Sequence, residues 1–111
     1  MKASTLLGLI LFGLGCTTTP AGHNRQVAME DFLFAPESLE VAVGDTVTWT
    51  NQGSYQHSTT SGQPGTPDGK WDSGLLGHGG AFAYVFTSAG NYHYYCQVHG
   101  ALGMKGVISA K

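Results

Sequence analysis

Charged residues are scarce in this chain, at 11% of 111 residues, and the formal net charge is -2. The long basic runs that attract nucleic acid are missing, which excludes a nucleic-acid partner. The sequence also lacks internal repeats and any stretch with the pattern of a long amphipathic helix. A chain of this length has room for one small domain. We therefore predict a single domain that is not helical.

Glycine, by contrast, is abundant: seventeen are present, roughly twice the ordinary usage. Glycine favours tight turns, and the many Val, Thr, Tyr and Phe residues favour strands. Apolar residues alternate in four places, which are Leu39, Val41 and Val43; Val47 and Trp49; Phe82, Tyr84 and Phe86; and Tyr92, Tyr94 and Cys96. About seven short strands separated by turns predict an all-β sandwich.

One long segment does not alternate. Residues 53–69, "GSYQHSTTSGQPGTPDG", are mostly turn formers and predict a functional surface loop. His57 is the exception within it. Trp71, just beyond this segment, is predicted to form a lid on the core.

The N-terminus has the plan of an export signal. Lys2 precedes an apolar run over residues 6–15 that stops at Cys16, and this run is too short for a membrane span. Residues 1–15 are predicted to be a signal peptide, and a small residue before Cys16 resembles a lipoprotein processing site. Gly13 stands where that motif usually has leucine. The alternative is ordinary cleavage within residues 17–22.

Either route of cleavage predicts an exported protein of the periplasm or cell envelope, bound to a membrane only through a lipid on Cys16. Residues 16–26 form a polar segment rich in Thr, Pro and Gly, which predicts a flexible tether. Residues 27–111 are then the folded domain.

Three donor residues lie close together near the C-terminus. Cys96, His99 and Met104 share one glycine-rich turn, and each offers a nitrogen or sulfur lone pair to a soft or borderline metal ion. His57 follows a strand that ends near Thr50, at the same kind of sheet end. Two imidazoles, one thiolate and a weak thioether are the set expected for a blue-copper electron-transfer site. Zinc would accept Cys and His but does not require Met.

The segments "VGDTVTWTN", "HSTTSG", "WDSGLL", "FTSAGNYHYYC" and "CQVHGALGMKGVI" resemble the plastocyanin, amicyanin and pseudoazurin branch of the cupredoxins, the type 1 blue copper proteins. The resemblance covers nearly all of residues 27–111. It implies a Greek-key sandwich of seven to eight strands that binds one type 1 copper ion. By resemblance, the copper ligands are His57, Cys96, His99 and Met104.

The resemblance also implies a one-electron carrier, by default a monomer, whose copper cycles between Cu(I) and Cu(II). Its partners would be larger redox proteins, acting as electron donor and acceptor. In the family the later histidine, here His99, breaks the surface amid small apolar residues, and residues 100–103 fit that description. Transient docking is therefore expected near His99.

Two departures from the plastocyanin pattern carry information. Val98 stands where plastocyanins typically have proline, so its amide is available. Together with the Ser58 amide, it could donate to the Cys96 sulfur and favour Cu(I). No acidic cluster lies near the loops, which argues against a photosynthetic role.

Other function classes remain open. The same domain could store or deliver copper, although delivery favours exposed sites rich in Met or His. A copper enzyme needs a further histidine cluster, and His23, His78 and His93 are not grouped in the sequence, so we predict that the protein is not an enzyme. A binuclear copper centre needs a second cysteine in the turn. A metal-free adhesion domain would leave the donor set unexplained.

Overall fold

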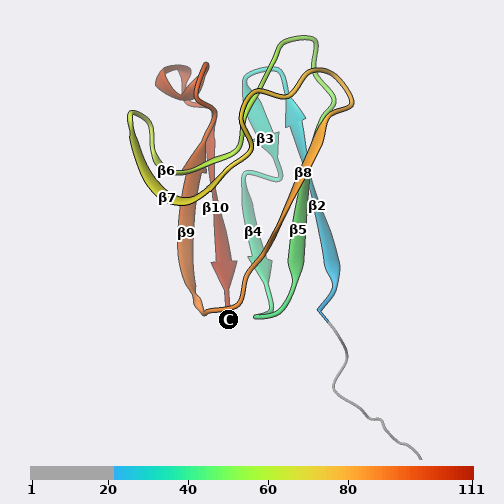
Figure 1. The fold of residues 1–111 in the computed structure, drawn as a ribbon, viewed down its shortest axis with the longest axis vertical. Helices are drawn as coiled ribbons and strands as arrows, with labels where there is room; N and C mark the ends of the chain where they lie inside the picture. Colours follow the sequence, from blue (N-terminus) through green and yellow to red (C-terminus); the bar gives the residue numbers. More distant parts are fainter. Residues whose placement is uncertain (1–21) are drawn as a thin grey trace, which may run out of the picture.

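The structure, a computed structural model, describes residues 22–111, which form two β-sheets packed face to face (Figure 1). The larger sheet contains, in spatial order, β4 (Ser38–Val41), β10 (Lys105–Ala110), β9 (Gly90–Tyr95), β6 (Thr60–Gln63) and β7 (Thr66–Asp72). The smaller sheet contains β3 (Leu33–Ala35), β2 (Asn24–Glu30), β5 (Thr46–Asn51) and β8 (Ala81–Val85). The predicted all-β Greek-key sandwich is confirmed, although residues 22–111 contain nine strands and not the seven to eight that were predicted.

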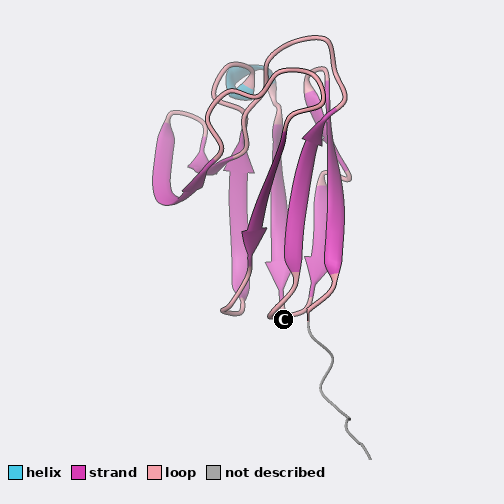
Figure 2. Cartoon of the chain, turned by 45° about the vertical axis from the view of Figure 1, so that its right-hand side comes forward, coloured by secondary structure: helices cyan, strands magenta, loops and turns pink. Residues whose placement is uncertain are grey.

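Both sheets are mixed. β2 runs parallel to β5, and β4 runs parallel to β10, whereas the other neighbouring strands are antiparallel. The chain passes from one sheet to the other five times, between β3 and β4, β4 and β5, β5 and β6, β7 and β8, and β8 and β9. Figure 2 shows that long loops and one short 3-10 helix, Gly100–Leu102, gather at the end opposite the C-terminus.

The core lies between the sheets and is rich in aromatic side chains. Alternation on β5 turns Val47 and Trp49 inward, and both are completely buried. The Trp49 ring lies 5.5 Å from that of Trp71 and 5.3 Å from that of Tyr94. Trp71 is 5% exposed, so it covers the core as predicted. Burial of such large rings is the main stabilising term in a domain of this size.

The folded part begins earlier than the sequence predicted. β2 starts at Asn24, which pairs with Thr46 of β5, so residues 24–26 belong to the sheet and not to the tether. The reason is a tertiary contact, since the His23 amide donates to the buried Asp45 carboxylate at 2.7 Å. The predicted signal peptide, residues 1–15, and the candidate lipid site Cys16 lie outside the described residues.

The predicted surface loop at residues 53–69 is only partly a loop. Its second half forms β6 and the start of β7, which pair as a hairpin. Pro64 and Gly65 make the turn, and Gly65 has φ of 82°, as the third residue of a type II turn requires. Val43, predicted to share a buried face with Val41, is 44% exposed because β4 ends at Val41. Across residues 22–111, no helix is long and apolar enough to cross a membrane.

Candidate metal centre

Three of the four predicted donors meet at the loop end of the sandwich. The ligand atoms of His57, Cys96 and His99 all lie within 4.8 Å of one another. Cys96 Sγ is 3.8 Å from His57 Nδ1 and 3.6 Å from His99 Nδ1, and the two Nδ1 atoms are 3.2 Å apart. Such separations suit one ion bonded at about 2.0–2.3 Å to each atom. One thiolate and two imidazoles fit copper.

Backbone hydrogen bonds close the turn that carries Cys96, His99 and Met104. The Cys96 amide donates to the Met104 carbonyl at 3.0 Å, and the Gly100 amide donates to the Cys96 carbonyl at 2.7 Å. The Met104 amide in turn donates to the His99 carbonyl at 3.3 Å. Gly103, with φ of 96°, supplies the left-handed residue after the 3-10 helix. The turn therefore folds back on itself, as its glycine content predicted.

Met104 lies at the end of this turn and is completely buried. It belongs to the same apolar cluster as Cys96. Its role as the fourth, axial donor remains a prediction.

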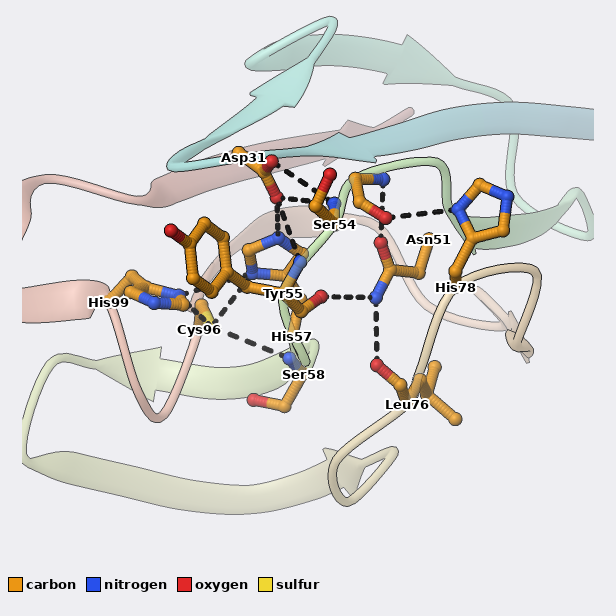
Figure 3. Close-up of polar contacts among 11 residues, drawn as sticks. Asp31, Asn51, Ser54, Tyr55, His57, Ser58, Leu76, His78, Cys96 and His99 are labelled. Carbon is orange, nitrogen blue, oxygen red and sulfur yellow. Dashed lines mark hydrogen bonds and ion pairs between the residues drawn. The ribbon is translucent and has the colours of Figure 1, made fainter.

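His57 reaches the site from a loop that is held in place by hydrogen bonds to its backbone. Its backbone pairs with that of Leu76, by hydrogen bonds of 3.1 and 2.8 Å. The buried Asn51 side chain donates to the carbonyls of Tyr55 and Leu76 and accepts from the Gly53 amide (Figure 3). The Asn51 side chain thereby holds residues 52–56 in place. The His57 ring therefore has a defined position, although the residue follows a loop.

A residue that the sequence analysis did not single out contacts His57 directly. Asp31 Oδ1 lies 3.0 Å from His57 Nε2, and the amides of Ser54 and Tyr55 also donate to this carboxylate (Figure 3). The Ser54 amide, followed by the His57 side chain, holds the pKa of Asp31 below its usual range. No sequence pattern connects Asp31 with a histidine 26 residues later. Only the pairing of β2 with β5 makes them neighbours.

The Cys96 sulfur accepts one backbone hydrogen bond. The Ser58 amide donates to Sγ at 3.4 Å, and the Ser58 hydroxyl accepts from the Gln97 amide at 2.9 Å. Among the hydrogen bonds of residues 22–111, none runs from the Val98 amide to the sulfur. One of the two donors expected from the sequence is thus in place.

His99 is less exposed than the resemblance implied, with only 9% of its surface accessible. Phe32 packs edge-on against it with ring centroids 5.0 Å apart, and the Tyr55 ring lies 6.1 Å away. The expected apolar surface exists, but large side chains form it. We call it the apolar rim, which consists of Phe32, Tyr55, Val98 and Leu102, exposed by 45%, 55%, 53% and 73%. Leu102 lies within the expected residues 100–103, whereas Phe32 and Tyr55 come from other loops and were not expected from the sequence.

The remaining histidines lie apart from this site. His78 is exposed and its Nδ1 contacts the Gly53 carbonyl at 3.0 Å, while His93 is exposed on β9. His23 lies near Asp45 at the base of β2. Within the described part of the chain, His57, Cys96 and His99 make up the one group of three such donors.

Comparison with known proteins agrees with this geometry. The family model for copper-binding proteins of the plastocyanin/azurin family matches residues 21–111. Plastocyanin from Scenedesmus fuscus is 31% identical over 86 residues, which are 71% of this chain and 87% of that protein.

Among solved structures, a purple cupredoxin from Nitrosopumilus maritimus superposes with a TM-score of 0.72 at 30% identity, covering 78% of this chain and 99% of that chain. A reduced variant of amicyanin gives a TM-score of 0.69 at 25% identity, covering 83% and 86% of the two chains. On fold, donor set and sequence, the chain belongs to the plastocyanin/azurin family of copper-binding proteins.

Proposed function

We propose that this protein carries single electrons between larger redox proteins, using one type 1 copper ion held by His57, Cys96, His99 and Met104. The observation that carries the proposal is the convergence of three buried donors, two Nδ1 atoms and one Sγ, within 4.8 Å. Copper, when bound, supplies one-electron chemistry by alternating between Cu(I) and Cu(II). Thiolate and thioether favour the first state, and imidazole accepts both.

The contribution of the protein is a site that changes little when its charge changes. The His57 backbone is paired with Leu76, and five internal backbone hydrogen bonds close the turn from Cys96 to Met104. His57, Cys96 and Met104 are completely buried, so water does not need to reorganise around them. A rigid, dry site lowers the reorganisation cost of gaining or losing an electron.

The apolar rim is where a partner would approach His99. It contains no charged side chain, and a small apolar contact suits brief encounters. The donor, the acceptor and the monomeric state are part of this proposal. So is an exported location, which rests on the leader-like residues 1–15 and on a lipid at Cys16 or cleavage nearby.

Copper storage or delivery is less well supported. Delivery requires ligands that an incoming protein can reach, yet His57, Cys96 and Met104 are completely buried. A copper enzyme would need a substrate-binding position beside the metal, and the other described histidines lie outside the donor group.

The test is the visible spectrum of the protein from Gly22 onward after addition of Cu(II). We expect an intense blue band that bleaches with a mild reductant and returns on oxidation, because the band reports a bond from the Cys96 thiolate to Cu(II). Cys96→Ser and His57→Ala should abolish it. His93→Ala, which removes an exposed histidine of β9 outside the donor group, should retain it. A colourless wild-type protein would contradict the proposal.

A further inference from the structure

The two histidines of the site are held in different ways. His57 Nδ1 faces Cys96 and His99, while His57 Nε2 lies 3.0 Å from Asp31 Oδ1. His99 has no hydrogen bond from its Nε2 among residues 22–111, and aromatic rings flank it instead. Only one of the two imidazoles therefore contacts a carboxylate.

The contact with Asp31 determines where the His57 proton resides. An ionised carboxylate can only accept hydrogen bonds, so it requires an N–H at Nε2. In neutral imidazole the other nitrogen, Nδ1, then keeps its lone pair. That lone pair faces the donor group, which is the tautomer that a metal ion needs. The His57 ring is completely buried, so solvent does not offer a competing partner.

We propose that Asp31 is a positioning residue of the copper site, which fixes the tautomer and orientation of His57 and increases the donor strength of Nδ1. A carboxylate that accepts from a metal-bound histidine makes the imidazole more basic. A stronger nitrogen donor favours Cu(II) over Cu(I) and so lowers the reduction potential. This inference rests on the proposed copper function.

The same carboxylate also holds the loop that carries His57. Oδ1 accepts from the Ser54 amide at 2.9 Å and from the Tyr55 amide at 3.2 Å, and Oδ2 accepts from the Ser54 amide at 3.1 Å. The Asp31 side chain is 29% exposed, so it lies at the border between the loop and solvent. Asp31 therefore fixes both the ring and the backbone of this part of the site.

The turn that contains Asp31 contacts both histidines of the site. β2 ends at Glu30 and β3 begins at Leu33, which leaves Asp31 and Phe32 as a two-residue turn. Phe32 has φ of 72°, a left-handed conformation that is uncommon for residues other than glycine. In this arrangement Asp31 contacts His57 and Phe32 contacts His99. One short turn therefore contacts both imidazoles of the site.

Three variants separate the charge of Asp31 from its hydrogen bonds. Asp31→Asn retains an oxygen for the three contacts of Oδ1 and removes the charge. Asp31→Ala removes both the charge and the oxygen that accepts these hydrogen bonds. Glu30→Gln is the matched control, because it removes one negative charge from the adjacent residue, whose side chain makes no hydrogen bond within residues 22–111.

The readouts are the reduction potential, the Cu(II) dissociation constant and the NMR signal of His57 Nε2–H in the zinc-loaded protein. We expect Asp31→Asn to raise the potential by several times the shift of Glu30→Gln. Asp31→Ala should weaken Cu(II) binding by about 10- to 100-fold, the usual cost of losing such a partner. It should also remove the Nε2–H signal that is protected in the wild type.

Equal potentials for Asp31→Asn and Glu30→Gln, together with an unchanged dissociation constant for Asp31→Ala, would overturn the inference. The proposed function would survive that result if the wild-type protein is blue and reversibly reducible. A wild-type protein that binds zinc but gives no blue band with Cu(II) would instead contradict the copper function. Each failure is therefore recognisable separately.

Discussion

Two completely buried methionines, Met29 and Met104, occupy different positions in one core. Met29 lies within β2 and pairs with Asn51 of β5, so it is not part of the turn that carries Cys96, His99 and Met104. Met104 ends the turn that begins at Cys96, and its backbone bonds to both Cys96 and His99. Burial alone does not distinguish a core filler from a ligand, and the position of Met104 in the donor turn is the reason why we predict it as the ligand.

Met104→Leu tests the axial role at the scale of one residue. Leucine has a similar volume, so we expect the fold to survive at a cost below about 1.5 kcal/mol. The axial thioether tunes the potential of such sites, and its loss should raise the potential measured by voltammetry while the blue band persists. Met29→Leu makes the same chemical change at a buried methionine that is not part of the turn. Equal potentials for the two variants would exclude Met104 as a ligand.

At the scale of elements, short turns decide where functional side chains lie. The turn between β6 and β7 reverses the chain at Pro64 and Gly65, which lets β7 return and bury Trp71 between the sheets. The Trp71 indole N–H donates to the Thr59 hydroxyl at 3.0 Å, and the next residue toward the N-terminus, Ser58, donates to Cys96. The hairpin thereby supports the loop on one side of the donor group.

Gly65→Ala measures what that turn requires. A Cβ at Gly65 would meet nothing within 4 Å, but φ is 82° there, and an alanine in this conformation costs about 1 kcal/mol or slightly more. Gly77→Ala is the control, since its Cβ would also meet open space and its φ is not in the left-handed range. Urea denaturation should show lower stability for Gly65→Ala only. An equal loss of stability in both variants would show that the left-handed conformation at Gly65 carries no extra cost for a side chain.

At the scale of the whole molecule, one end of the sandwich holds the candidate metal centre and the other end stabilises the fold. The loop end contains the donor group, while the opposite end is closed by Asp45, which is only 2% exposed. The Asp45 carboxylate accepts from the amides of Ala42 and His23, at 2.9 and 2.7 Å. These two bonds, with that from Ala42 the larger effect, hold the pKa of Asp45 below its usual range. They connect the start of β2 with the turn before β5.

Asp45 therefore gives a pH-dependent stability that is separate from the metal site. Because its folded pKa is below the unfolded value of about 4, its contribution is present above that pH and is lost as pH falls through the folded pKa. Asp45→Asn should be less stable than wild type at pH 7, and the gap should narrow below about pH 4. Denaturant titration between pH 7 and pH 3 measures this difference in stability and its change with pH.

Glu37→Gln is the control for this series, because the Glu37 side chain forms no hydrogen bond or ion pair in the described part of the chain. We expect it to follow the wild-type pH profile. A gap between Asp45→Asn and wild type that stays constant with pH would contradict the role given to the carboxylate.

The apolar rim also acts at the scale of the whole molecule, because it is the surface through which electrons would leave. Leu102→Glu places like charges face to face when two copies meet, so the rate of electron self-exchange should fall by about tenfold at low salt, an effect of ordinary size for electrostatic steering. NMR line broadening in mixtures of reduced and oxidised protein measures this rate. Val43→Glu adds the same charge at the opposite end and should have little effect. Equal rates for both variants would place the exchange surface elsewhere.

The sequence by itself determined the features that depend on local spacing. Alternation of apolar residues predicted the strands, because side chains on a strand point to opposite faces in turn. The donors Cys96, His99 and Met104 are close in sequence, so their common turn was also predictable. The turn-rich residues 53–69 misled the prediction, because a Pro-Gly turn inside a hairpin has the composition of a loop.

The tertiary structure alone decided which distant residues complete the site. Asp31 and Phe32 meet His57 and His99 only because β2 lies beside β5 in one sheet, with the β2–β3 turn at the same end as the donor loops. Asp45 likewise fixes the start of the folded domain, because its carboxylate accepts a hydrogen bond from the His23 amide, 22 residues earlier in the chain. Contacts of this kind arise from strand order and register, which local residue patterns do not specify.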